Sequence, residues 1–236
     1  MIKKHIPNCI TCLNLASGIL GIIAAMKGCP AAAFALMIAA SVFDFCDGLA
    51  ARFLNAYSDM GKELDSLSDM VSFGVLPALL LSQCMQLGGV TGWVSYLPLV
   101  LAVFSGLRLA KFNVDTRQES DFLGLATPSS ALLSAALACY VFLTPDSFLT
   151  GLCRSEWFLP RVAAMLSALL VSEIPMFGMK IKKGQKLLDT KRIVFLVLAA
   201  AAIVCTIVLH RHFSLAVLLV FSIYILENLL YRIFAR

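Results

Sequence analysis

The chain has 236 residues, of which 60% are apolar and 14% charged, with a formal net charge of +5 and a mean hydropathy of +0.90. Soluble domains carry about 25% charged residues, so this composition excludes a water-soluble globule. The apolar runs are unbroken and rich in Ala and Leu, without the alternation of barrel strands, which excludes a transmembrane β-barrel. A nucleic-acid partner is not expected either, because no basic stripe is interleaved with stacking aromatic residues.

The apolar runs predict an all-α, polytopic bundle of about eight transmembrane helices, since each crossing needs about 20 mostly apolar residues. No polar linker and no repeated motif divides the sequence, so we expect a single domain over residues 1–236. Residues 1–30 share some features of a signal peptide, but polar residues interrupt the apolar stretch, which favours an uncleaved first helix. The expected helices cover residues 10–27, 32–56, 62–86, 91–112, 127–145, 158–179, 192–209 and 213–234.

The distribution of basic residues predicts the orientation of this bundle. If the N-terminus is cytoplasmic, 15 of the 19 Lys and Arg residues fall in cytoplasmic segments, including the basic loop 180–191. Because Lys and Arg are retained on the cytoplasmic side, we expect a multi-pass protein of a bacterial-type inner membrane with both termini cytoplasmic. The net positive charge suits contact with the anionic headgroups of the bilayer.

Six of the 14 acidic residues fall between positions 44 and 69, at the ends of the second and third expected helices. Asp44 and Asp47 share a helix face with Gly48 and Ala51, and Asp65 and Asp69 share a face of the next helix. The short connection makes the two helices antiparallel, so the four carboxylates converge.

Four adjacent carboxylates cannot all ionise unless positive charge lies between them. Oxygen ligands of this kind suit two divalent cations, Mg²⁺ or Mn²⁺, which assist phosphoryl chemistry. Small residues that merely let two helices touch explain the glycine and alanines but leave the carboxylates uncompensated. A non-enzymatic cation transporter is a further alternative, although it predicts acidic residues along a midplane path rather than at one end.

The pattern Asp44-x2-Asp47-Gly48-x2-Ala51-Arg52-x8-Gly61-x3-Asp65-x3-Asp69 is similar to the signature of the CDP-alcohol phosphotransferase family. The resemblance implies an enzyme that cleaves a CDP-linked substrate, releases CMP and joins the other half to an alcohol. It implies two metal ions held by the four aspartates, with Asp69 as the base, and an active site at the cytoplasmic ends of helices 2 and 3. The expected contacts with the CDP-linked lipid come from Gly48, Ala51, Arg52, Gly61, Asn8 and Thr11.

Residues 69–78, 108–113 and 122–128 resemble the phosphatidylserine synthases of that family. This implies CDP-diacylglycerol and L-serine as substrates, with Arg108, Lys111 and Asn113 near the acceptor. Glycerol 3-phosphate, inositol and inositol phosphate stay open as acceptors. The resemblance covers about residues 5–135, whereas the helices over about 158–234 are generic. Members of the family are often dimers, so a homodimer is expected by resemblance alone.

Overall fold

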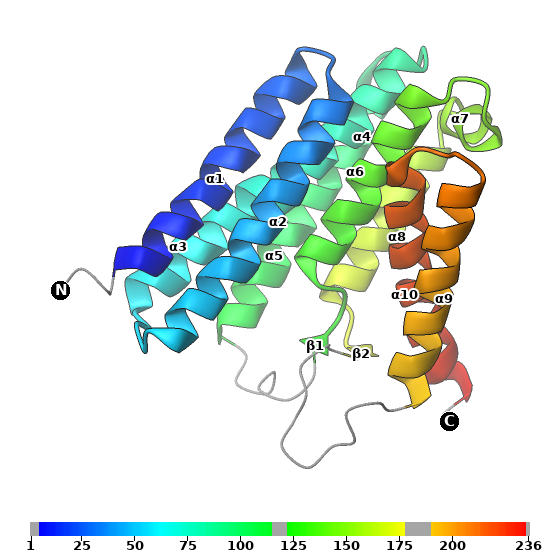
Figure 1. Ribbon diagram of the computed structural model, residues 1–236. Helices are drawn as coiled ribbons and strands as arrows, with labels where there is room; N and C mark the ends of the chain where they lie inside the picture. Colours follow the sequence, from blue (N-terminus) through cyan, green and yellow to red (C-terminus); the bar gives the residue numbers. More distant parts are fainter. Residues whose placement is uncertain (1–4, 115–121, 178–189, 235–236) are drawn as a thin grey trace.

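The computed structural model describes residues 5–114, 122–177 and 190–234, and these residues form a bundle of helices (Figure 1). The predicted all-α, polytopic class is confirmed. That residues 1–236 form one domain stays a prediction, and residues 180–189 of the basic loop lie outside the described part. The helices are α1 His5–Met26, α2 Pro30–Phe53, α3 Asp59–Asp69, α4 Leu76–Leu87, α5 Val100–Val114, α6 Thr127–Leu143, α7 Phe148–Cys153, α8 Phe158–Val171, α9 Thr190–Val208 and α10 Phe213–Phe234.

One π-helix, which is wider than an α-helix, and one 3₁₀-helix, which is tighter, complete the bundle. A π-helix over Met70–Val75 joins α3 to α4, so that Asp59–Leu87 is a continuous helical rod. A 3₁₀-helix over Trp93–Leu99 leads into α5. Neither segment is predicted by the hydrophobic pattern, because both contain the same apolar residues as an α-helix.

Each of the eight helices expected from the sequence corresponds to a helical segment among the described residues, and Figure 1 shows these segments side by side in the bundle. Six of them are long and apolar enough to span a membrane, whereas α6 and α8 are shorter apolar helices. The prediction of a helix over 158–179 is too long, because α8 ends at Val171. Beyond it, Pro175–Met176 (β2) pairs antiparallel with Phe122–Leu123 (β1), and a residue before proline disfavours helical backbone.

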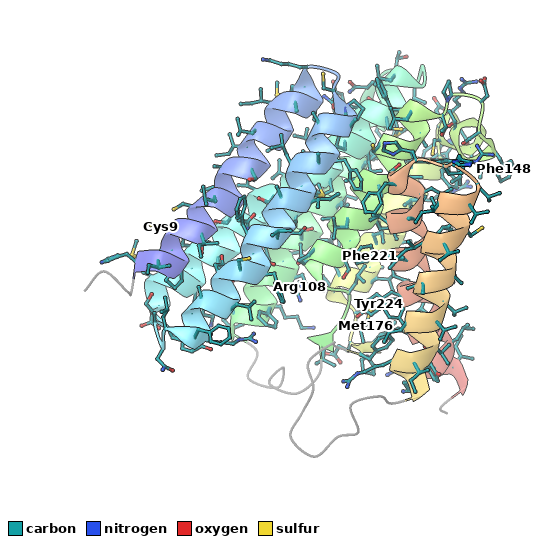
Figure 2. All side chains as sticks on the ribbon, viewed as in Figure 1. Cys9, Arg108, Phe148, Met176, Phe221 and Tyr224 are labelled. Carbon is teal, nitrogen blue, oxygen red and sulfur yellow. The ribbon has the colours of Figure 1, made fainter. Side chains whose placement is uncertain are left out.

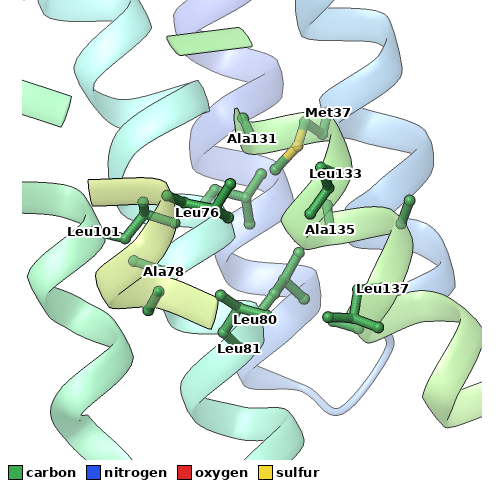
Figure 3. Packing of buried hydrophobic residues seen from close by; sticks show 14 of the residues in the cluster. Met37, Leu76, Ala78, Leu80, Leu81, Leu101, Ala131, Leu133, Ala135 and Leu137 are labelled. Atoms are coloured by element: carbon green, nitrogen blue, oxygen red, sulfur yellow. The ribbon is translucent and has the colours of Figure 1, made fainter. Parts of the chain in front are cut away.

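Helix α6 lies at the centre of the bundle, with 12 of its 17 residues buried. Figure 3 shows Met37 of α2, Leu76 and Leu80 of α4, and Leu133 of α6 packed together. A helix of this length is only about 26 Å long, less than the apolar thickness of a bilayer. Its neighbours shield it from lipid, so its ends lie within protein, where polar backbone is tolerated.

The connection between α2 and α3 is built by local sequence signals. Asn55 adopts a left-handed backbone with φ of 47°, which ends α2 and which Asn tolerates better than most residues. Ser58 then caps α3, its Oγ accepting a hydrogen bond from the Gly61 backbone N–H at 3.0 Å. We call the end of the bundle that holds this connection, residues 54–58, the aspartate end. Figure 1 shows the first described residues, β1, β2 and the end of α10 at the same end.

Candidate active site

The signature aspartates lie on facing surfaces of α2 and α3 near the aspartate end. One carboxylate oxygen from each of Asp44, Asp47 and Asp65 lies within 4.8 Å of the others. Asp47 is buried, whereas Asp44 and Asp65 are half-buried. The predicted convergence of the two helices therefore occurs for three of the four carboxylates. Asp69 lies one turn further along α3, where it is buried and interacts electrostatically with Asp44 and Asp65.

These carboxylates have the chemistry of a site for hard divalent cations. Asp47 Oδ2 and Asp65 Oδ1 are buried without a hydrogen-bond partner. Across the described ranges, no basic side chain forms an ion pair with any of the four aspartates. Buried, unpaired carboxylate oxygens cost free energy unless positive charge compensates them. An all-oxygen donor set of this kind fits Mg²⁺ or Mn²⁺, so the residues present fit the implied metal ions.

Asn14 is a site residue that the sequence reasoning did not assign. It is fully buried in the middle of α1, and its Nδ2 donates a hydrogen bond to Asp69 Oδ1 at 3.2 Å. Its position gives a signal, since Thr11, Asn14 and Gly18 follow helical spacing on the buried face of α1. The identity of its partner depends on the packing of two distant helices, which spacing alone does not reveal.

Helix α1 is held against the aspartate-bearing rod by a close seam. Ser72 Oγ donates to the backbone carbonyl of Asn14 at 3.1 Å, and Ser68 Oγ lies 3.4 Å from that of Thr11. A Cβ atom at Gly18 would lie 2.3 Å from Ser72 Oγ and 2.9 Å from Ser72 Cα. Glycine is therefore required at this position for the two backbones to approach. The seam fixes the height of α1 relative to Asp65 and Asp69.

The residues expected to contact the CDP-linked lipid lie around the cluster in different environments. The Thr11 hydroxyl donates to the Pro7 carbonyl at 3.1 Å and lies within hydrogen-bonding reach of Asp47. Nothing lies within 4 Å of a Cβ built on Gly48, so this part of α2 is open to a ligand. Gly61 is covered instead, because its Cβ would lie 3.0 Å from Asn8 Oδ1 and from the oxygen of its own cap, Ser58 Oγ.

The other two lipid contacts expected from the signature occupy the last turns of α2. Ala51 is half-buried, one turn beyond Asp47, while Arg52 is exposed in the last turn of the helix. A cation in the last turn of a helix interacts favourably with the helix dipole, which accounts for Arg52 without a ligand.

Of the three residues expected near the acceptor, Arg108 is the one that interacts electrostatically with the aspartate cluster. It is buried on α5, its Nη1 donates to Thr127 Oγ1 at 3.2 Å, and its guanidinium stacks 5.0 Å from the centroid of the Phe112 ring. Arg108 also interacts electrostatically with Asp69. Figure 2 shows Arg108 toward the same end of the bundle as Met176. A buried guanidinium next to a carboxylate cluster is positioned to pair with an anionic substrate group.

The other two residues expected near the acceptor contact protein groups. Lys111 Nζ lies 3.7 Å from Glu173 Oε1, and both side chains are substantially exposed. Asn113 Nδ2 donates to Ser66 Oγ at 2.8 Å, while its backbone carbonyl accepts from Lys62 Nζ at 3.0 Å. Their side chains therefore tie α5 to its neighbours at the aspartate end.

The chain is similar to known proteins over most of its length. Residues 4–172 match the family model described as CDP-alcohol phosphatidyltransferase. A CDP-diacylglycerol–serine O-phosphatidyltransferase of Mycobacterium bovis is 39% identical over 178 residues, which cover 72% of this chain and 60% of that protein. The chain thus matches less than two thirds of the length of its mycobacterial relatives.

Two archaeal proteins extend this comparison. A CDP-diacylglycerol–serine O-phosphatidyltransferase of Methanocaldococcus jannaschii is 31% identical over 93% of this chain and 91% of its own length. An archaetidylserine synthase of Methanothermobacter thermautotrophicus is 34% identical over 72% of this chain and 70% of its own length. Together with the family model, which covers both the aspartate cluster and Arg108, these matches show that the chain belongs to the CDP-alcohol phosphatidyltransferase family.

Proposed function

We propose that this protein transfers the phosphatidyl group of CDP-diacylglycerol to the hydroxyl of L-serine, giving phosphatidylserine and CMP. The observation that carries the proposal is the buried Arg108 next to the cluster of aspartates. The cluster supplies sites for the cations that a diphosphate requires, and the arginine supplies a partner for a carboxylate-bearing acceptor. The names of the relatives, which include serine in both bacterial and archaeal members, support the same acceptor.

Asp44, Asp47, Asp65 and Asp69 are the residues that would hold two divalent cations. When bound, the cations neutralise the diphosphate and the charge that develops on the leaving CMP. The open backbone at Gly48 leaves room for the nucleotide. Thr11, within hydrogen-bonding reach of Asp47, and Asn8, next to Gly61, are further proposed contacts. Arg52, exposed at the end of α2, is a proposed contact for a phosphate besides its interaction with the helix dipole.

Asp69 is the proposed base. It accepts the proton of the serine hydroxyl as the hydroxyl oxygen attacks the phosphorus bonded to the diacylglycerol oxygen. The bond between that phosphorus and the CMP oxygen breaks, and CMP leaves with the electron pair. Positioning of the hydroxyl against a fixed carboxylate accounts for much of the expected rate enhancement.

Arg108 is the proposed partner of the serine carboxylate. Its guanidinium is held by Thr127 and Phe112 and needs no further ordering when serine binds. Lys111 and Asn113 stay predictions for acceptor binding, since their contacts with Glu173 and Ser66 orient the end of α5 on which Arg108 lies.

We place the aspartate end on the cytoplasmic side of the membrane, because 15 of the 19 Lys and Arg residues fall in the segments that the sequence predicts to be cytoplasmic. The acyl chains of CDP-diacylglycerol then lie in the bilayer, with the diphosphate at the interface. We also expect a homodimer from the resemblance to the family.

The proposal is tested with purified protein in lipid nanodiscs, supplied with CDP-diacylglycerol, Mg²⁺ or Mn²⁺, and one acceptor at a time. Serine, glycerol 3-phosphate, inositol and inositol phosphate are compared by CMP release and by mass spectrometry of the lipid product. Phosphatidylserine formation with serine alone supports the proposal. Turnover of another acceptor but not serine overturns the acceptor and keeps the reaction, whereas no CMP release with any acceptor overturns both.

A further inference from the structure

One further residue of the site, Asn14, lies outside the signature, on α1. We propose that Asn14 is a positioning residue for Asp69: its amide nitrogen holds one carboxylate oxygen and thereby fixes the other oxygen toward the acceptor hydroxyl. The proposal rests on the proposed role of Asp69 as base.

The contact between the two residues is specific and buried. Asn14 Nδ2 lies 3.2 Å from Asp69 Oδ1, and both side chains are more than nine-tenths buried. An ionised carboxylate only accepts hydrogen bonds, so the nitrogen of the amide must be the atom that faces Asp69. One oxygen of Asp69 is therefore engaged by the protein, and rotation of the carboxylate about its Cβ–Cγ bond is restrained.

The backbone that carries Asn14 is itself fixed. Ser72 Oγ donates to the Asn14 carbonyl. Because Gly18 has no Cβ atom, α1 can pack directly against the backbone of Ser72. Ser72 belongs to the π-helix that begins directly after Asp69. The same seam thus locates the donor and the acceptor of the Asn14–Asp69 bond, as is needed for a positioned base.

Packing alone does not explain an asparagine at this position. Asn14 Oδ1 is buried without a hydrogen-bond partner among the residues that the structure describes. The one hydrogen bond that the amide side chain makes is therefore the bond to Asp69. An effect on the Asp69 carboxylate, rather than a complete set of hydrogen bonds, accounts for the asparagine.

The chain contains a matched residue with the opposite character. Asn228, on α10, is equally buried, but both ends of its amide are satisfied: Oδ1 accepts from the Phe177 backbone N–H at 2.9 Å, and Nδ2 donates to the Tyr224 carbonyl at 2.7 Å. We infer that Asn228 is a structural asparagine. The same substitution at the two positions then has opposite consequences.

The test compares Asn14→Leu with Asn228→Leu in nanodiscs. Asn14→Leu is expected to lower kcat roughly 10- to 100-fold, with little change in the KM for CDP-diacylglycerol or in the Mg²⁺ concentration for half activation. It should lower the Tm no more than Asn228→Leu does, because it breaks one hydrogen bond rather than two. Asn228→Leu is expected to lower the Tm and to leave kcat per folded molecule unchanged. Asn14→Ala removes the donor without adding volume and guards against overpacking by leucine; the same loss of kcat is expected.

A double variant separates positioning from a general effect on the site. If Asn14 acts through Asp69, Asn14→Leu lowers turnover in the wild-type background but causes no further loss in the Asp69→Asn background. Independent, multiplicative losses, or a loss of activity that a smaller folded fraction fully explains, would overturn the inference. Normal turnover of Asp69→Asn alone would instead overturn the proposed base, so the two failures are distinguishable.

Discussion

Replacement of Arg108 by alanine tests the proposed acceptor most directly. A charge-assisted hydrogen bond contributes about 1.5–3 kcal/mol, and about 1.4 kcal/mol corresponds to a tenfold change. Arg108 is 8% exposed, so solvent screens its interaction with a bound carboxylate only weakly. We therefore expect Arg108→Ala to lower kcat/KM for serine roughly 10- to 100-fold.

The assay follows CMP release with two acceptors, serine and ethanolamine, the latter being serine without its carboxylate. If Arg108 binds the carboxylate, Arg108→Ala lowers kcat/KM for serine alone, and the preference of the enzyme for serine over ethanolamine shrinks by the same factor. Arg108→Lys keeps the charge but loses the planar fork, so we expect an intermediate loss. Arg161→Ala, at an exposed arginine of α8, serves as the control for removal of a cation.

An equal loss on both acceptors would refute this reasoning, because it would mean that Arg108 acts on the diphosphate, on Asp69 or on the fold. Saturation curves for CDP-diacylglycerol distinguish these cases. A raised KM for the lipid indicates the diphosphate, whereas an unchanged KM with a lowered kcat indicates Asp69. A lowered Tm indicates that the buried contacts with Thr127 and Phe112 mainly stabilise the bundle.

Three further predictions concern the metals, the glycines and the topology. Chelation should abolish CMP release and Mg²⁺ or Mn²⁺ should restore it, with Asp44→Asn requiring a higher metal concentration; full activity in excess chelator would contradict the metal site. Gly18→Ala should lower stability by about 1–3 kcal/mol in thermal unfolding, whereas Gly48→Ala should leave the Tm unchanged and weaken CDP-diacylglycerol binding. In single-cysteine variants, an impermeant maleimide added outside should label Cys29 but not Tyr57→Cys; labelling of both from one side would contradict the crossing of α2.

The aspartate cluster was predictable because its geometry is local. Helical spacing places Asp44 with Asp47 and Asp65 with Asp69, and a connection of only five residues brings the two pairs together. The positions of the eight helical segments were equally accessible, since they depend on the length of apolar runs. The end of α8 was not, because Pro175 and Met176, which were expected in the helix, pair with β1 instead.

The side-chain partners at the site could not be predicted from the spacing of residues in the sequence. Arg108 and Lys111 are three residues apart, which predicts a shared face, yet Arg108 is buried and bonds to Thr127, whereas Lys111 lies next to Glu173. The flexible stem of lysine reaches the nearest carboxylate, and Glu173 lies on a segment after α8 whose path the sequence does not specify. Asn14 was likewise missed, because its partner lies 55 residues away on another helix.

The π-helix at Met70–Val75 has a consequence for how the rod from α3 to α4 tolerates change. An α-helix turns about 100° per residue, and a π-turn accommodates one extra residue without rotating the helix beyond it. The segment thus lets Asp65 and Asp69 face α1 and α2 at one end while Leu76 and Leu80 face α6 at the other. A single-residue deletion within the segment would restore regular helix and leave both halves facing their partners, whereas a deletion elsewhere in the rod would rotate one half against the other by about 100°. The π-helix is therefore the part of the rod where the chain can lose one residue while the catalytic half and the packing half both keep their partners.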